Sequence, residues 1–292
     1  MKMKVIFMGT PEFAVVPLEM LIKENINVVA VVTQPDRPVG RKRVITPPPI
    51  KKLAVQYDIP VYQPEKVKDE HFIDTLIALE PDIITVVAFG QILPKKVLKI
   101  PKIGCINVHA SLLPKYRGAA PIQWSIINGE SVTGVTTMWM DEGLDTGDIF
   151  LQEQIAIKND WTSEDLSREL SYLGGNLLLK TLLCIKSGNL IRKPQNHEES
   201  TYAPMLKKED GKINWLKNTN EIYNLIRGTY PWPGSYTIRN GREIKIWKAK
   251  PYSAGIKSHP GRFMGLVKNE GFLVGTGDCS ILILELQEAG KK

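Results

Sequence analysis

The chain has 292 residues, of which 43% are hydrophobic and 24% charged, as in a soluble globular protein of one large or two ordinary domains. It contains no apolar run near the roughly 20 residues that a membrane-spanning helix needs, and its three scattered cysteines argue against a disulfide framework or a zinc site and favour a reducing, cytoplasmic setting. The net charge of +7 resides in residues 190–292, which hold 17 basic and 10 acidic side chains, whereas residues 1–189 hold 21 of each.

Predicted strands and helices alternate through the first two thirds of the chain. Strands are predicted over residues 5–8, 28–33, 61–63, 82–89, 104–109, 133–140 and 149–157. Helices are predicted over residues 11–25, 50–58, 69–80, 121–128 and 162–186. The first strands are apolar throughout, as in a parallel sheet that is covered on both faces. The alternation predicts a doubly wound, mostly parallel, Rossmann-like α/β domain.

The last third of the chain has a different pattern. Residues 187–204 are polar and irregular, and one helix is expected at about 219–227. Beyond it, Asn240-Gly241 lies between two extended runs, which is the strongest short-range signal of a β-hairpin. We therefore expect a domain at 1–188, a linker at 189–205, and a basic, OB-like antiparallel β-barrel at 206–292. Its charge suits a nucleic acid, although ordinary surface solvation explains the charge equally well.

A basic loop is expected at residues 34–49, between the strand predicted over 28–33 and the helix predicted over 50–58. Its sixteen residues include five prolines, and its basic side chains are Arg37, Arg41, Lys42 and Arg43. Loops this long are usually functional or disordered. It is either an arm that contacts a phosphate backbone or a solvated, flexible tip.

Asn107 and His109 lie at the end of the strand predicted over 104–109. Alternate residues of a strand share a face, so the amide and the imidazole are neighbours, roughly 6.5–7 Å apart along the strand. Ligands of open α/β sheets bind where strands end. The pair is therefore either a reaction centre or two polar groups satisfied by hydrogen bonds.

A carboxylate for this pair is available in the loop DEGLDTGD, residues 141–148. A carboxylate beside an imidazole orients it and favours its charged form. An amide donor can stabilise an oxyanion, and an imidazole–carboxylate pair can accept protons from an attacking amine. An amide, an imidazole and a carboxylate together suit acyl transfer in which the amine substrate attacks directly, without a nucleophilic side chain of the protein. Ser111 lacks the turn of a nucleophilic serine, and Cys105 is better explained as a small buried side chain.

The motifs around this site resemble the folate-dependent formyltransferases. They are Asn107-x-His109, Ser111-Leu112-Leu113-Pro114, Arg117-Gly118 and the Asp145 of GLDTGD. Further stretches, MGTPEFA, TQPDRP, AFGQILP and PWPGSY, extend the likeness over nearly the whole chain. The basic loop and the basic C-terminal barrel favour the branch of the family that acts on tRNA. Members of that family commonly continue beyond the point where this chain ends.

The resemblance implies transfer of a formyl group from 10-formyltetrahydrofolate to the amino group of methionine on initiator methionyl-tRNA, in translation initiation. Asn107, His109 and Asp145 would be catalytic. The donor would be bound by Phe89, Gly90, Gln91, Ile92, Leu93, Ser111, Leu112, Leu113, Pro114 and Asp141. The tRNA would be bound by Arg37, Arg41, Lys42 and Arg43. No metal, membrane or obligate protein partner is implied.

Other functions predict different features. A formyltransferase that acts on glycinamide ribonucleotide or an amino sugar nucleotide would have no need of the basic barrel. A non-catalytic RNA-binding protein would be expected to lack Asn107, His109 or Asp145, and all three are present. A dinucleotide-dependent oxidoreductase would carry G-x-G-x-x-G after its first strand, which this chain lacks.

Overall fold

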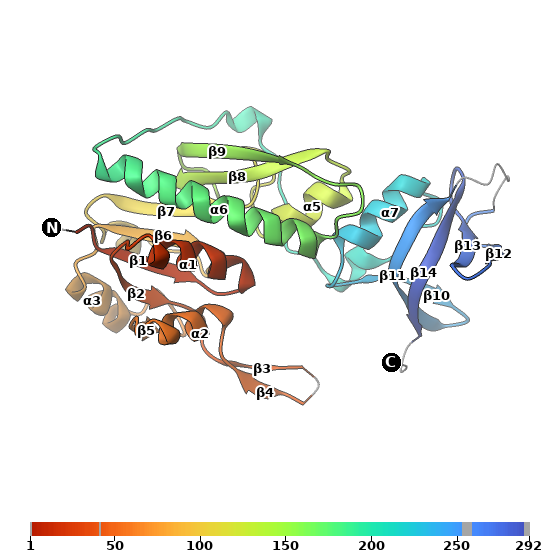
Figure 1. The fold of residues 1–292 in the computed structure, drawn as a ribbon, viewed down its shortest axis with the longest axis horizontal. Coiled ribbons are helices and arrows are strands. Elements are labelled where there is room, and N and C mark those ends of the chain that lie inside the picture. Colours follow the sequence, from red (N-terminus) through yellow and green to blue (C-terminus); the bar gives the residue numbers. More distant parts are fainter. Residues whose placement is uncertain (1, 41, 253–258, 289–292) are drawn as a thin grey trace. The chain divides into compact units, whose positions relative to one another are not determined.

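A seven-stranded sheet forms the centre of the N-terminal half of the protein (Figure 1). The computed structural model describes residues 2–40, 42–252 and 259–288. The strands of this sheet run in the order β5-β2-β1-β6-β7-β8-β9. Their bounds are β1 Val5–Gly9, β2 Val28–Val32, β5 Val61–Tyr62, β6 Ile83–Val87, β7 Gly104–His109, β8 Val132–Trp139 and β9 Ile149–Ala156.

The topology of the sheet confirms the predicted doubly wound arrangement. Strands β5, β2, β1, β6 and β7 are parallel, and β8 is antiparallel to β7. The chain runs outward from β1 through β2 to β5 and then returns to β6 on the other side of β1. The order therefore reverses between β1 and β6, and in open α/β sheets ligands bind at the carboxyl ends of the two strands at such a reversal.

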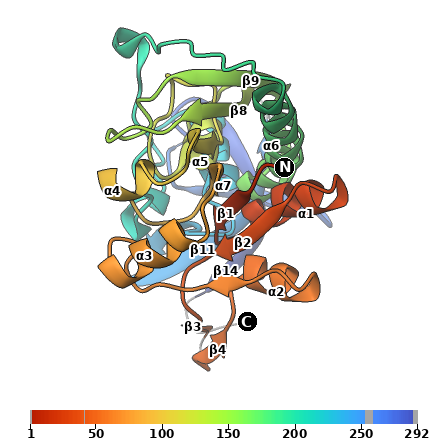
Figure 2. The same ribbon diagram turned by 90° about the vertical axis from the view of Figure 1, so that its left-hand side faces the viewer.

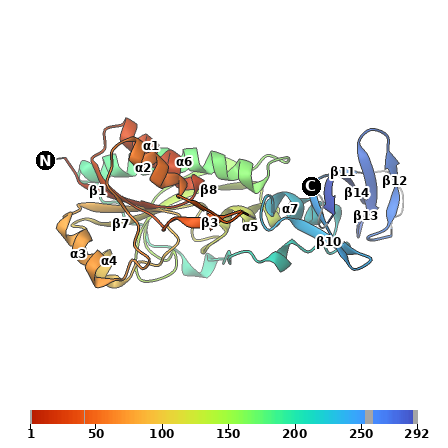
Figure 3. The ribbon, with the colours of Figure 1, turned by 90° about the horizontal axis from the view of Figure 1, so that it is seen from below.

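Helices cover both faces of this sheet (Figures 2 and 3). One face carries α1 (Val15–Lys23), α2 (Pro49–Gln56) and α6 (Ser163–Lys186), and a short 3-10 helix, η1 (Glu12–Ala14), precedes α1. The other face carries α3 (Glu70–Ala78) and α4 (Lys95–Leu98), the latter not expected from the sequence. Alternate strand residues divide between the faces: Ile6 and Met8 belong to the cluster that includes Phe72 of α3.

A five-stranded antiparallel sheet forms the C-terminal part, as expected. Its order is β10-β11-β14-β13-β12, with bounds β10 Ser235–Arg239, β11 Arg242–Tyr252, β12 Phe263–Val267, β13 Gly271–Gly275 and β14 Ser280–Glu288. Helix α7 (Thr219–Gly228) packs Ile222 and Ile226 against Ile246 and Ile281. The two-residue turn at Asn240-Gly241 has positive φ at both positions, so the predicted hairpin is confirmed.

The described chain divides into two compact units that do not follow one cut in the sequence. One comprises Met1–Arg117, Gly134–Ile155 and Arg168–Tyr202, and the other comprises Gly118–Thr133, Ala156–Ser167 and Ala203–Lys292. Helix α5 (Pro121–Ile127) belongs to the second unit, where Trp124 donates to the carbonyl of Pro204. Short 3-10 helices occur at His197–Glu199 (η2) and Lys208–Gly211 (η3). The chain therefore passes between the units more than once.

Residues 34–49, expected from the sequence to be a loop, contain two short strands. Strands β3 (Arg37–Val39) and β4 (Val44–Thr46) form an antiparallel hairpin, visible in Figure 1 as the two-stranded projection beyond α2. Val39 pairs with Val44, and Gly40 and Arg43 have positive φ in the turn between them. Both strands are three residues long and largely exposed, so no alternation of apolar and polar residues marks them in the sequence.

Asp82 links the start of β1 to the start of β6. Its carboxylate accepts hydrogen bonds from the backbone N–H of Lys4 at 2.7 Å and from the Lys102 ammonium at 3.1 Å. These bonds favour the charged carboxylate, so the pKa of Asp82 is lowered, chiefly by the Lys4 N–H. A lowered pKa adds stability above the ordinary value of 3.8, and that stability is lost as the pH falls through the folded-state value.

We expect Asp82→Asn to lower the melting temperature at pH 7 by about 2–4 °C, because the amide keeps the shape of the side chain but loses its charge. The difference from wild type should shrink below pH 4, where the wild-type carboxyl is also neutral. Thermal unfolding followed by circular dichroism at several pH values measures it, with Asp74→Asn on the exposed face of α3 as control. A difference that stays constant with pH would contradict this account.

Candidate active site

The carboxyl ends of β1, β6 and β7 meet at one edge of the parallel sheet. Gly9 pairs with Val87, and Val86 pairs with Asn107, so the three strands end in register. The Thr10 hydroxyl, just after β1, donates to the carbonyl of Phe89, just after β6, at 2.8 Å. The segments predicted to bind the donor and to carry the reaction therefore follow adjacent strands.

Asn107, His109 and Asp145 lie together at the end of β7. The Asn107 amide donates to one oxygen of the Asp145 carboxylate at 3.4 Å. The other oxygen lies 3.7 Å from Nδ1 of His109. The imidazole is 6% exposed and the carboxylate 15%, so their interaction is weakly screened by water. The structure thus brings together all three residues that the sequence analysis selected as catalytic.

The loop between β8 and β9 carries Asp145 back over the face of β7. The loop leaves β8 where the N–H of Met140 donates to the carbonyl of Cys105, near the start of β7. Asp145 has φ of 53°, in the left-handed region. Asp141 stabilises the loop from within, because its carboxylate accepts bonds from the N–H of Gly143 and the hydroxyl of Thr146. The predicted contact of Asp141 with the donor stays a prediction.

The turn after β7 determines which nitrogen of His109 carries a proton. Nε2 lies 2.8 Å from the carbonyl oxygen of Tyr116, which can only accept a hydrogen bond. Nε2 is therefore protonated and donates to that oxygen, and Nδ1 is the nitrogen that faces Asp145. The Ser111 hydroxyl is buried and donates to the carbonyl of Lys115 at 2.6 Å, so it stabilises the turn.

Cys105 shares the strand face of Asn107 and His109 but is buried in the apolar cluster beneath them. Burial raises the pKa of its thiol to about 12, because the thiolate would lose its hydration. At neutral pH almost none of this residue is in the nucleophilic form. The interpretation of Cys105 as a small buried side chain is confirmed.

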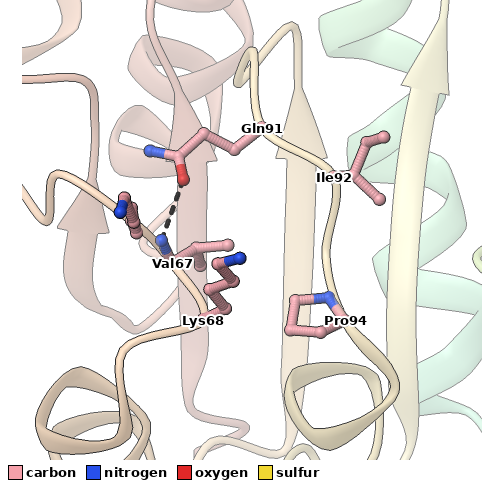
Figure 4. A pocket seen from close by; sticks show the side chains of 6 residues that line it. Val67, Lys68, Gln91, Ile92 and Pro94 are labelled. Atoms are coloured by element: carbon pink, nitrogen blue, oxygen red, sulfur yellow. Dashed lines mark hydrogen bonds between the residues drawn. The ribbon is translucent and has the colours of Figure 1, made fainter.

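A cavity of roughly 310 Å³ lies beside the segment after β6. Figure 4 shows Gln91 reaching from that segment towards Val67, whose N–H donates to the Gln91 side-chain oxygen at 2.8 Å, and Ile92 on the opposite wall. Ile92 is 87% exposed, whereas Phe89 and Leu93 on either side are buried. The remaining lining residues are Lys66, Lys68 and Pro94.

The basic residues predicted to contact tRNA occupy different parts of the β3–β4 hairpin. Arg37 pairs with Thr46 near the base, whereas Lys42 and Arg43 lie in the turn, and all three basic side chains are exposed. Arg41 lies outside the described residues. The base of the hairpin is anchored by Asp36, which forms an ion pair with Lys51 and accepts a hydrogen bond from Gln63. Gln63 and then Lys51 lower the pKa of Asp36.

Two residues that support the site, Arg117 and Gln195, were not among those predicted from the sequence to act there. Arg117, quoted in the sequence analysis only as part of a motif, donates to the side-chain oxygen of Gln195 at 2.7 and 3.2 Å. Gln195 donates in turn to the backbone carbonyl of Asp145. Gln195 lies in the segment that was expected to be a linker, and nothing in the local pattern KPQNHEES marks it as buried.

Two classes of feature are absent from the part of the chain that the structure describes. None of its helices has the length and apolar character to cross a lipid bilayer. Within the same residues, no three His, Cys, Asp or Glu side chains gather in a way that could hold a metal ion.

Comparisons with known proteins identify relatives along the whole chain. Residues 1–182 match the family described as formyl transferase, and residues 205–292 match the formyl transferase C-terminal domain. The chain is 50% identical over 290 residues to the methionyl-tRNA formyltransferase of Clostridioides difficile (strain 630), covering 99% of this chain and 94% of the relative. It is 51% identical over 291 residues to that of Halalkalibacterium halodurans, covering 99% and 92%.

A solved structure shares the fold at lower identity. It is the N-formyltransferase of Helicobacter canadensis in complex with folinic acid and dTDP-3-aminofucose. The two structures superpose with a TM-score of 0.74 and 24% identity, covering 98% of this chain and 99% of the other.

The raised pKa of Cys105 predicts that iodoacetamide leaves this thiol unmodified in the folded protein at pH 8, while the partly exposed Cys184 reacts. Peptide mass spectrometry after timed labelling measures both residues in one sample, and labelling in denaturant shows that every cysteine can react. Equal labelling of Cys105 and Cys184 in the folded state would contradict the burial argument.

Proposed function

The chain belongs to the formyl transferase family, and we propose on that premise that it transfers a formyl group from 10-formyltetrahydrofolate to the amino group of methionine on initiator methionyl-tRNA. The observation that carries the proposal is the cluster of Asn107, His109 and Asp145 at the sheet edge. The choice of acceptor is supported by the methionyl-tRNA formyltransferases, to which about half of the residues are identical along nearly the whole chain.

Asn107 has the chemistry to stabilise the oxyanion of the reaction. Attack of the methionine amine on the formyl carbon forms a C–N bond and moves charge onto the formyl oxygen. One N–H of the Asn107 amide points to Asp145, and the second can donate to that oxygen. A fixed donor in a site screened from water strengthens its interaction as the charge develops, which lowers the barrier.

His109 and Asp145 manage the proton that the attacking amine must lose. Because Nε2 of His109 is held by the Tyr116 carbonyl, Nδ1 is the position where a proton is gained or lost, and Asp145 faces it. A proton taken there passes to the N10 nitrogen of the donor when its bond to the formyl carbon breaks. The products are the formylated amine and tetrahydrofolate, so no residue of the protein is consumed.

The donor site that we propose surrounds the ends of β6 and β7. It comprises Phe89 to Leu93, Ser111 to Pro114 and Asp141. The cavity beside Gln91 and Ile92, with an exposed isoleucine on its wall, supports binding of a partly apolar ring system there. Lys66 and Lys68 lie on the same cavity and are exposed, which suits the carboxylates of the donor's glutamate tail.

The tRNA would be held by two elements. The β3–β4 hairpin presents Lys42 and Arg43, with Arg37 at its base, and Arg41 precedes Lys42 in the sequence. The excess of basic residues after residue 189 supports contacts of the C-terminal domain with the tRNA backbone.

We further propose a catalytic domain at 1–188, a linker at 189–205 and a tRNA-binding domain at 206–292. The gap between the two family matches, residues 183–204, supports this division. A role in translation initiation also favours a cytoplasmic protein. Nothing in the proposed reaction calls for an obligate protein partner.

Other amine acceptors receive less support. The sugar formyltransferase from Helicobacter canadensis shares the fold, but at 24% identity the likeness does not extend to the acceptor. A glycinamide ribonucleotide or an amino sugar nucleotide would also leave the basic hairpin without a role. These compounds therefore serve as competing acceptors in the test below.

We expect the purified protein to form formyl-methionyl-tRNA from 10-formyltetrahydrofolate and charged initiator tRNA. His109→Ala should lower the turnover number by roughly 10²–10⁴-fold, because proton transfer is lost, while tRNA still binds. Formyl-methionine released by mild hydrolysis reports the product, and His71→Ala, at an exposed histidine, is the control. Transfer to a nucleotide acceptor in place of tRNA would contradict the proposed function, and wild-type turnover by His109→Ala would contradict the site.

Reversing the charge of Lys42 and Arg43 to Glu should raise the KM for tRNA roughly tenfold or more, since phosphate contacts become repulsive. The KM for the donor should stay at the wild-type value. Steady-state kinetics with each substrate varied in turn separate the two effects, and Lys180→Glu with Lys186→Glu, exposed on α6, matches the change of net charge. Equal damage to both KM values would refute a specific role of the hairpin.

A further inference from the structure

Residues 191–202, here called the strap, follow α6 and belong to the same compact unit as Asn107, His109 and Asp145. Every residue from 189 to 202 is described, and Gln195 is the one that is buried, at 6% exposure. The strap pairs with β9, where Ile149 and Lys193 exchange two backbone hydrogen bonds. Trp139 donates to the carbonyl of Ile191, and the guanidinium of Arg192 lies 4.0 Å above the Trp139 ring. The strap is therefore held firmly beside the loop that carries Asp145.

The side-chain amide of Gln195 uses all of its hydrogen-bonding capacity. Its nitrogen donates to the backbone carbonyls of Asp145 at 2.9 Å and Gly147 at 2.7 Å. Its oxygen accepts from Nε and Nη2 of Arg117. A guanidinium can only donate, so Arg117 determines which end of the amide faces the two carbonyls. These hydrogen bonds restrict the backbone conformation of Asp145, and that conformation determines where its carboxylate points.

The far end of the strap reaches the second partner of His109. The Thr201 hydroxyl accepts from the N–H of Tyr116 at 2.8 Å, and its carbonyl accepts from the N–H of Arg117 at 2.9 Å. Tyr116 supplies the carbonyl that holds Nε2 of His109. The strap thus contacts the backbone of both residues between which the imidazole lies.

We propose that Gln195 is a positioning residue for formyl transfer, which fixes the backbone of Asp145 so that its carboxylate faces Asn107 and His109, with Arg117 orienting the Gln195 amide. The inference rests on the proposed function, because the role of Asp145 belongs to that function. Gln195 touches neither substrate nor the reacting atoms in this scheme. Its loss should therefore change the rate of the chemical step and not the binding of either substrate.

Gln195→Glu and Gln195→Met test the proposal together. Glu keeps the size of the side chain and its bonds to Arg117 but directs an oxygen at two carbonyl oxygens. Met removes the N–H donors without adding a charge, so Gln195→Met tests the positioning role even if Gln195→Glu does not fold. Both should lower kcat by roughly 10²-fold, the cost of displacing a catalytic group by about 1 Å. Both KM values should stay within about threefold of wild type.

The neighbouring Asn196 provides the matched control. Its exposed amide bonds within the strap, to the N–H of Glu198 and the carboxylate of Glu199, so Asn196→Ala should keep the wild-type kcat. Arg117→Met combined with Gln195→Met should cost little more than Gln195→Met alone, because Arg117 acts through the amide. Additive losses in kcat would contradict that orienting role.

Two results would overturn the proposal. One is a wild-type kcat in both Gln195 variants, and the other is a loss confined to KM. A crystal structure of Gln195→Met gives a readout without activity: residues 145–147 should shift, and an unmoved Asp145 carboxylate would refute the positioning role. A wild-type protein that formylates no acceptor would contradict the proposed function instead, and the Gln195→Met structure would still decide the role of Gln195.

Discussion

The geometry of the site depends on one close backbone approach, between Gly147 and the end of β8. A Cβ on Gly147 would come within 1.9 Å of the carbonyl oxygen of Trp139, a contact that no other residue type can make. This approach lets the 140–148 loop turn back over β7 instead of extending beyond the sheet. Asp145 thereby reaches two side chains nearly 40 residues earlier in the chain, and the site exists only because the loop is folded back.

The conformation of this loop is stabilised by hydrogen bonds from a residue outside it, Gln195. Asp145 lies in a left-handed conformation, which costs roughly 1 kcal/mol or more for a residue with a side chain unless its surroundings favour it. The buried amide of Gln195 supplies bonds to the carbonyls of Asp145 and Gly147 that water would otherwise have to satisfy. The left-handed backbone of Asp145 and the hydrogen bonds that Gln195 donates to this loop therefore depend on each other.

The proposed catalytic site and the proposed tRNA-binding hairpin are built from different kinds of structure. Asn107 and His109 lie at the end of β7, with the imidazole buried, and hydrogen bonds connect the proposed catalytic groups to one another and to the backbone. The hairpin is instead exposed: its valines and the side chains of Arg37, Lys42 and Arg43 face solvent, while Asp36 and Lys51 form an ion pair at its base. A rigid site suits transfer between two small groups, whereas an exposed projection suits a large, charged partner.

The sequence by itself determined the parts of this protein that depend on local periodicity. Buried strands, the Asn240-Gly241 turn and the shared face of Asn107 and His109 all follow from spacings of one or two residues. The hairpin at 37–46 escaped prediction because its three-residue strands are exposed and carry no alternating pattern. The protonated nitrogen of His109 and the contact of Gln195 with Asp145 were decided by tertiary structure alone. Both depend on bonds to backbone carbonyls, which every residue has, so no sequence pattern distinguishes the ones that are used.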